Sequence, residues 1–258
     1  MLQPPLLIEG PKFSFNFEFP SNSFHLSQRF VINNQPIYLY NSSDFDTTED
    51  EECSLDKSLN NDEPLEHTIL TSTSVWDASL ILAKFLEKQY YENKINFKEK
   101  NFIELGSGTS IPSITTSILG AKQVTITDAP SVIPQIKKIT KLNSLLKKPV
   151  NVESLDWVNR KENLETLKNG RWDYILGSEI VWVDHLIKPL IETIDVLSTP
   201  SYTKLLISHQ SRTVRCDNLF FNGLKDLGWK LDKISHDELN WEEGFLKDGV
   251  EIYYGYKE

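Results

Sequence analysis

The sequence lacks several features that would place it in a common class of protein. It has only two cysteines, Cys53 and Cys216, so a disulfide framework is excluded, and no ligand spacing indicates a metal site. No apolar run reaches the roughly 18 residues of a membrane span, and the start of the chain has no signal-peptide pattern. We therefore expect a cytoplasmic protein without a metal or a membrane partner, with the nucleus as a second location.

Basic charge is also scarce. The net charge is −10, and residues 44–66 carry ten acids against one base, which is −9 of that total. The rest of the chain is therefore nearly neutral. Nucleic-acid backbones are bound by clustered Lys and Arg, so this composition excludes a nucleic-acid-binding protein. We interpret residues 41–66 as an acidic flexible loop, because a stretch rich in Ser, Asn and Asp has little to bury.

What the sequence does contain is enough apolar material for one large domain, since hydrophobic residues make up 39% of the chain. Residues 1–40 are expected to form an N-terminal β-hairpin extension, because 13–19 and 31–40 alternate apolar and polar side chains. Residues 75–91 have the apolar spacing of a helix. The main domain is expected over residues 67–258.

Beyond this helix, short apolar runs alternate with helical segments. Such alternation predicts an α/β fold with a mostly parallel sheet and helices on both faces. The last two expected strands are joined by the short link 235–250 with no clear helix, so the final strand is expected to be antiparallel. Strands are expected at 101–105, 123–127, 150–155, 172–176, 204–208, 229–234 and 251–256, and helices near 111–119, 131–147, 160–168, 185–198 and 215–227.

The first of these strands ends in a glycine turn. Glu104 lies at the end of the strand, Gly106 and Gly108 follow, and a helix is expected from Ile111. Glycines at such a turn let backbone N–H groups approach a ligand beside a helix N-terminus. The second strand ends in Asp128, an acid that can accept both hydroxyls of a ribose. The spacing therefore predicts a site for a nucleoside-containing ligand.

The residues around the turn separate two such ligands. A dinucleotide turn needs a third glycine at the place of Ile111, where glycine permits close packing of helix on strand. A carboxylate at Glu104 suits the cationic amino group and sulfonium of S-adenosylmethionine better than a pyrophosphate. The sequence thus favours S-adenosylmethionine over a dinucleotide, and a purely structural turn is the remaining alternative.

Five motifs together make the chain resemble methyltransferase family 16, the seven-strand protein-lysine methyltransferases that act on chaperones and elongation factors. The resemblance covers roughly residues 70–235 and implies a seven-stranded Rossmann-like methyltransferase sheet, S-adenosyl-L-methionine as cofactor and a protein substrate, such as a chaperone or translation factor. We also expect a monomer. The motifs are Ser74-Val-Trp-Asp-Ala78, Ile103-Glu-Leu-Gly-Ser-Gly-Thr109, Thr125-Ile-Thr-Asp128, Leu155-Asp-Trp157 and Asp173-Tyr-Ile-Leu-Gly-Ser-Glu-Ile-Val-Trp182.

The resemblance also implies roles for single residues. Trp157 would lie against the adenine, because an aromatic side chain suits a flat base, and Trp76 would close over the methionine end. Glu104 is added because its carboxylate suits the cationic groups of S-adenosylmethionine. The expected cofactor-binding residues are Trp76, Glu104, Gly106, Ser107, Gly108, Asp128, Trp157 and Ser178.

The expected acceptor site departs from the family's pattern. Relatives that act on lysine usually end the fourth strand with Asp-x-x-Tyr, where this chain has Glu179 and Trp182. A carboxylate can hold an ammonium and an aromatic face can stabilise it, so we expect these two residues to be catalytic. The expected activity is protein-lysine N-methylation. A protein-arginine methyltransferase and a catalytically idle binding module are the alternatives.

Two further positions complete the expectations from sequence. Ser110 stands where the family commonly has a third glycine, a change that we expect to shift cofactor affinity. His209 follows the fifth strand on the same rim, and we interpret it as a hydrogen-bonded structural histidine, with a role as a base as the alternative.

Overall fold

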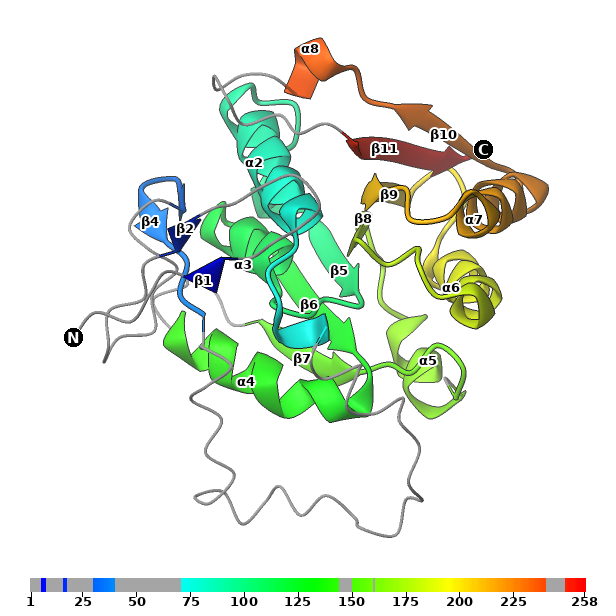
Figure 1. Cartoon of the computed structure of the whole chain (residues 1–258), viewed down its shortest axis with the longest axis horizontal. Helices are drawn as coiled ribbons and strands as arrows, with labels where there is room; N and C mark the ends of the chain where they lie inside the picture. Colours follow the sequence, from blue (N-terminus) through cyan, green and yellow to red (C-terminus); the bar gives the residue numbers. More distant parts are fainter. Residues whose placement is uncertain are drawn as a thin grey trace, which may run out of the picture.

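The computed structural model describes residues 6–7, 16–17, 30–39, 71–143, 150–159, 161–239 and 249–258. The expected acidic loop at 41–66 lies outside these residues, as does most of the strand expected at 13–19. The centre of the described chain is a seven-stranded sheet (Figure 1). Its strands are β5 (Asn101–Leu105), β6 (Gln123–Asp128), β7 (Asn151–Ser154), β8 (Tyr174–Ser178), β9 (Lys204–Gln210), β10 (Trp229–Lys233) and β11 (Val250–Lys257).

The strands are arranged in the order β10-β11-β9-β8-β5-β6-β7. Neighbours from β7 to β9 pair in parallel, whereas β11 is antiparallel to both β9 and β10. This confirms the expected α/β sheet with an antiparallel last strand. The strand β5 pairs with β6 on one side and with β8 on the other, so the order of the sheet reverses beside β5.

Helices connect most of the strands. The expected helix at 131–147 is observed only over 133–142, after a single 3-10 turn at 130–132, and residues 144–149 lie outside the described chain. The link 235–250 contains one helical turn that the sequence did not predict. The Ser235 hydroxyl caps this turn, and Leu239 within it is buried. The α-helices are α2 (Asp77–Tyr91), α3 (Ile111–Ile118), α4 (Ile133–Leu142), α5 (Lys161–Leu167), α6 (Asp184–Leu197), α7 (Val214–Asp226) and α8 (His236–Leu239).

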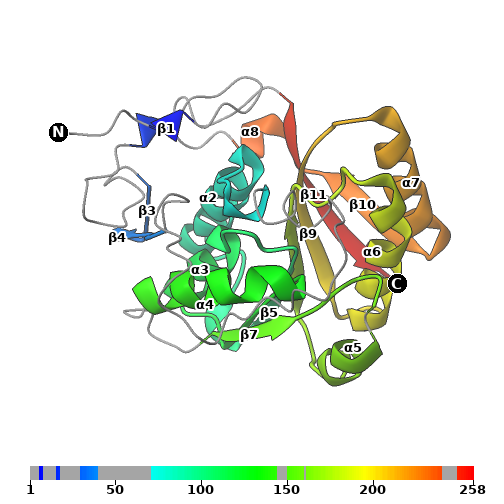
Figure 2. The same ribbon diagram turned by 60° about the horizontal axis from the view of Figure 1, so that its bottom comes forward.

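Apolar side chains pack on both faces of the sheet, because successive residues of a strand point to opposite sides. Phe102 of β5 belongs to a first core with α2, α3 and α4, and its neighbour Ile103 belongs to a second core with α5, α6 and α7. Figure 2 shows these helices on either side of the strands. Both side chains are fully buried, and each such burial stabilises the fold by about 1.5–3 kcal/mol.

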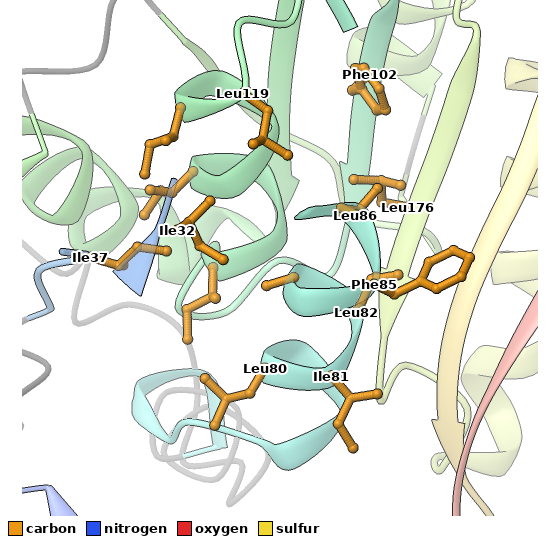
Figure 3. Packing of buried hydrophobic residues seen from close by; sticks show 14 of the residues in the cluster. Ile32, Ile37, Leu80, Ile81, Leu82, Phe85, Leu86, Phe102, Leu119 and Leu176 are labelled. Carbon is orange, nitrogen blue, oxygen red and sulfur yellow. The ribbon is translucent and has the colours of Figure 1, made fainter. Parts of the chain in front are cut away.

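A short antiparallel hairpin, β3 (Val31–Ile32) and β4 (Gln35–Pro36), confirms the expected N-terminal hairpin. Asn33 and Asn34 form its turn with φ values of 49° and 61°, as the tightest hairpin turns require. Ile32 and Ile37 are buried in the first core beside α2 (Figure 3). A second pair of two-residue strands, β1 (Leu6–Leu7) and β2 (Asn16–Phe17), is also antiparallel.

Buried polar groups on α2 bind the hairpin. The Lys84 ammonium donates to the carbonyl of Val31 at 2.9 Å, and the Glu87 carboxylate accepts from the Asn33 N–H at 2.6 Å. Lys84 and Glu87 also pair with each other at 2.8 Å. An unpaired buried charge is costly, and here each charge is compensated by the other. The same two side chains hold the hairpin against α2.

Candidate active site

A cavity of about 630 Å³ lies beyond the carboxyl ends of β5, β6, β7 and β8, where ligands bind in open α/β sheets. The segment before α2 and the start of α6 complete its walls. The cavity thus lies where the strand order of the sheet reverses beside β5. The lining residues are Thr71, Ser72, Trp76, Ser79, Gly106, Ser107, Gly108, Thr109, Asp128, Ala129, Leu155, Asp156, Trp157, Ser178, Glu179, Ile180, Trp182, Val183, His185, Leu186 and Arg212.

The turn after β5 lines the cavity, and its two glycines have left-handed backbone conformations. Gly106 and Gly108 have φ values of 58° and 49°. A Cβ at Gly106 would lie 2.9 Å from Ile180 and 3.0 Å from the Trp157 ring, and one at Gly108 would lie 3.3 Å from the Ser72 carbonyl oxygen. Both the conformation and the close approach therefore require glycine at these two positions.

Asp128 orders this turn from the end of β6. One oxygen of its carboxylate accepts from the Gly108 N–H at 2.8 Å and the other from the Ala129 N–H at 2.7 Å. Burial raises the pKa of Asp128 to about 6, although these two hydrogen bonds favour the charged form. Each carboxylate oxygen keeps a further lone pair with which to accept a hydroxyl from a ligand in the cavity.

Glu104 does not line the cavity. Its side chain is fully buried, and one carboxylate oxygen accepts from the Ser113 N–H at 3.0 Å in the first turn of α3. The other oxygen has no hydrogen-bond partner among the described residues, and burial raises the pKa of Glu104 to about 8. In this structure the carboxylate thus joins β5 to α3, and its expected contact with a cofactor remains a prediction.

Two tryptophans flank the turn. The Trp157 ring lies against Gly106 from the segment after β7. Trp76 precedes α2, and its indole N–H donates to the Thr71 carbonyl at 3.0 Å, which fixes the ring at the cavity wall. Both tryptophans therefore line the cavity, and their contacts with a cofactor remain a prediction.

Glu179, directly after β8, also lines the cavity. Its φ of 55° is left-handed, a strained conformation for a residue other than glycine, which costs about 1–3 kcal/mol. The Glu179 N–H donates to the Ser208 carbonyl at 3.0 Å, and this bond holds the turn. Burial raises the pKa of the Glu179 carboxyl, and the adjacent Arg212 opposes that rise.

Trp182 and Arg212 also line the cavity. Trp182 is 40% exposed and lines the mouth of the cavity. Arg212 follows β9, and its Nε donates to Glu179 at 2.8 Å while its guanidinium lies 5.4 Å from the centre of the Trp76 ring. Glu179 lines the same cavity as the Trp76 and Trp182 side chains, and a carboxylate and aromatic faces are groups that bind a cation.

His209 is a buried structural residue, as expected. Its Nε2 lies 2.8 Å from the Asp217 carboxylate on α7, and it is not among the residues that line the cavity. The described residues contain no group of three or more His, Cys, Asp or Glu side chains that could hold a metal ion. Nor is any described helix both long and apolar enough to cross a membrane.

The structure gathers most of the residues singled out from the sequence around one cavity, with Glu104 behind its wall. The sequence argument missed Arg212, Asp156 and the segment at 71–72. Arg212 stands in the same rim segment as His209, so its charge next to an expected strand end was the available signal. The residues gathered at the cavity are Trp76, Gly106, Ser107, Gly108, Asp128, Trp157, Ser178, Glu179 and Trp182.

Comparison with known proteins gives one consistent result. The family model described as lysine methyltransferase matches residues 57–227. EEF1A lysine methyltransferase 3 of Xenopus tropicalis is 35% identical over 150 residues, which are 58% of this chain and 62% of that protein. A protein N-lysine methyltransferase of Danio rerio is 35% identical over 156 residues, 58% of this chain and 66% of the fish protein.

A third relative is a protein N-terminal and lysine N-methyltransferase of Candida glabrata. It is 29% identical over 182 residues, which are 67% of this chain and 69% of that protein. The chain therefore spans less than two thirds of the frog and fish relatives and slightly more of the yeast one.

Proposed function

Because the chain belongs to the lysine methyltransferase family, we propose that it transfers a methyl group from S-adenosylmethionine to a lysine side chain of a protein. The observation that carries the proposal is that two different groups line one cavity. The first is a glycine turn held by Asp128, and the second is the buried carboxylate of Glu179. A nucleoside ligand suits the first group and a cationic side chain suits the second, so we call their surroundings the first, or cofactor, end and the second, or acceptor, end.

The residues at the first end fit the cofactor. A Cβ at Gly106 would meet Ile180 and Trp157, and one at Gly108 would meet Ser72, so glycine lets the turn lie close against these residues at the cavity. Asp128 can accept the ribose hydroxyls, and the Trp157 face can stack on the adenine. S-adenosylmethionine would supply a methyl group on a sulfonium, from which it is readily displaced by a nucleophile.

At the second end, Glu179 and Trp182 stand where relatives have Asp-x-x-Tyr. The Glu179 carboxylate can hold the acceptor ammonium, and the Trp182 ring can stabilise this cation until it releases its proton to solvent water. The apolar walls disfavour the charged amine, which lowers its pKa and favours the neutral nucleophile. In this proposal, alignment and exclusion of water provide most of the catalysis, and Glu179 positions the amine.

Isothermal titration with S-adenosylmethionine, followed by transfer of a tritiated methyl group to a cell extract, tests the proposal. We expect binding, labelled protein and a modified lysine identified by mass spectrometry. Absence of binding by a folded sample contradicts the cofactor assignment. Binding without labelled protein supports the idle binding module instead, a modified arginine supports an arginine methyltransferase, and label confined to small molecules contradicts a protein substrate.

The variant Glu179→Gln tests the role of Glu179 in methyl transfer separately from cofactor binding. We expect the variant to bind S-adenosylmethionine as the parent does, while labelling falls by at least about tenfold, since a tenfold change in rate corresponds to about 1.4 kcal/mol. Glu165→Gln is the matched control, because Glu165 is exposed on α5 and forms an ion pair with its helix neighbour Lys168.

We propose further that the protein acts as a monomer on a translation factor or chaperone, in the cytoplasm or the nucleus. One relative is named for EEF1A. Light scattering of the purified protein tests the monomer, fluorescence imaging of a tagged protein tests the location, and methylation of purified EEF1A alongside whole extract tests the substrate.

A further inference from the structure

Arg212 occupies the acceptor end of the cavity. Its Nε donates to the Glu179 carboxylate at 2.8 Å, and its guanidinium carbon lies 5.4 Å from the centre of the Trp76 ring. The arginine side chain is 26% exposed, whereas that of Glu179 is 5% exposed, so the cation reaches from the rim down onto a buried anion. This is an ion pair capped by an aromatic face.

Glu179 needs a cation in this position. Burial disfavours its charged form, and an unpaired buried carboxylate would be costly or would take up a proton. The backbone N–H of Gln210 also hydrogen-bonds to the carboxylate, but it brings no positive charge. Arg212 is the cation within hydrogen-bond distance of Glu179 in the described part of the chain.

A protonated lysine amine, the methyl acceptor of the proposed function, is itself a cation, and it would pair with the same Glu179 carboxylate. Building on the proposed function, we propose that Arg212 is a specificity-determining residue, whose guanidinium occupies the cation site on Glu179 that an acceptor side chain must take by displacing it. A free amine offers little binding energy beyond its charge. A lysine on a protein brings contacts outside the cavity that offset the lost ion pair, so the arginine selects protein-borne lysines over small amines.

The same contacts allow a different role, in which Arg212 pairs with the carboxylate of the cofactor's methionine end. The two roles predict opposite results. A cation that blocks the acceptor site weakens amine binding and leaves cofactor binding unchanged, whereas a partner of the cofactor strengthens cofactor binding and leaves amine binding unchanged.

The experiment compares the parent chain with Arg212→Ala and Arg212→Gln. The probe is n-butylammonium, which reproduces a lysine side chain, and its binding is followed by tryptophan fluorescence with and without S-adenosylhomocysteine. Titrations are run at neutral and mildly alkaline pH, because loss of Arg212 removes a charge that opposes the raised pKa of Glu179. We expect both variants to bind the probe on the order of tenfold more tightly than the parent.

Arg215→Ala is the matched control. Arg215 lies on α7, is 77% exposed and pairs with Asp184, so its loss also removes one arginine and one ion pair close to the site. We expect this variant to bind n-butylammonium as the parent does. Equal tightening in Arg215→Ala would show a general charge effect and would overturn the inference.

Cofactor titration separates the remaining outcomes. Unchanged S-adenosylmethionine binding with tighter amine binding supports the inference. Unchanged amine binding in both Arg212 variants overturns it, and a large loss of cofactor affinity in the same variants assigns Arg212 to the cofactor. Failure of the parent itself to bind S-adenosylmethionine contradicts the proposed function, whatever the amine titration gives. If Arg212→Ala does not fold, as judged by circular dichroism, Arg212→Gln provides the same comparison.

Discussion

Two residues at or beside the cavity have left-handed backbone conformations although neither is glycine. Ser110 and Glu179 have φ values of 59° and 55°. This conformation costs a residue other than glycine about 1–3 kcal/mol. The strain persists because the surrounding bonds determine the turn, such as the Ser110 N–H bond to the Ser107 carbonyl at 2.6 Å.

Glu104 should give the protein a recognisable dependence of stability on pH. Burial raises its pKa from 4.5 to about 8, so the folded state binds its proton more tightly than the unfolded state. Its contribution to the free energy of unfolding is therefore fully present below about 4.5 and is lost as the pH rises through about 8.

Glu104→Gln removes this titration. We expect the parent to lose at least about 1 kcal/mol of stability relative to the variant across that range, since one pKa unit corresponds to about 1.4 kcal/mol. Urea unfolding of both proteins at several pH values measures the difference. A difference between them that stays constant with pH would contradict the assignment.

Asp128 should make cofactor binding depend on pH. Its carboxylate must be ionised to accept two hydroxyls, and burial raises its pKa to about 6. We expect the affinity for S-adenosylmethionine to be constant above this pH and to fall below it, because a proton then competes with the ligand for the carboxylate.

Asp128→Asn should weaken the same binding by about 1–3 kcal/mol and remove the acidic limb. Calorimetric titration from neutral to mildly acidic pH measures both effects. Asp232→Asn, at an exposed position on β10, is the control and should bind as the parent does. Retention of the acidic limb in Asp128→Asn would assign it to another group.

At the scale of elements, the site depends on strands that end side by side. The ends of β6, β5 and β8 are neighbours in the sheet, and the chain leaves β5 and β8 toward different edges. Residues that are far apart in sequence, such as Asp128 and Glu179, therefore face one cavity. The segment between β9 and α7 adds Arg212 to the cavity lining.

The N-terminus of α7 provides a test at this scale. The Thr213 hydroxyl accepts from the Cys216 N–H at 3.1 Å and caps the helix. Thr213→Ala should lower the free energy of unfolding by about 1 kcal/mol, the usual effect of losing such a cap. Thr213→Ser keeps the hydroxyl and should unfold in urea as the parent does. An equal loss in both variants would show that the cap is not the cause.

At the scale of the whole molecule, one sheet separates two cores, and the hairpin β3–β4 extends the first of them. The cavity opens at the edge of this sheet, between elements that belong to both cores. Leu155 and Ile180, which line the cavity, belong to the second core, and Ala129, which also lines it, packs against the first. We therefore expect a ligand in the cavity to contact both cores and to stabilise the fold as a unit.

Thermal unfolding with ligands tests this coupling. S-adenosylmethionine at about 100 times its dissociation constant should raise the free energy of unfolding by about 2.7 kcal/mol, because it binds only the folded state. NAD at the same concentration is the control for the dinucleotide alternative and should leave the unfolding temperature unchanged. A larger shift with NAD would contradict the assignment of the ligand.

Local patterns in the sequence were sufficient to predict most of the fold. The alternation of apolar runs and helical segments predicted every strand of the sheet, and β5 was predicted with its observed ends. The glycine turn and Asp128 were predictable because a turn and a strand end depend on residues near in sequence. The start of α4 was predicted less well, because Pro130 begins a 3-10 turn, which apolar periodicity does not show, and Pro134 lies in the first turn of the α-helix that follows.

The sequence by itself thus determined the order of the elements, the family and the strand ends that carry the cavity. Only the tertiary structure decided that Glu104 faces Ser113 behind the cavity wall, and that Arg212 reaches Glu179 across 33 positions of sequence. The physical reason is that periodicity and turn chemistry arise between near neighbours. The partner of a buried charge is chosen instead by which strands lie side by side, and that depends on the packing of the whole sheet.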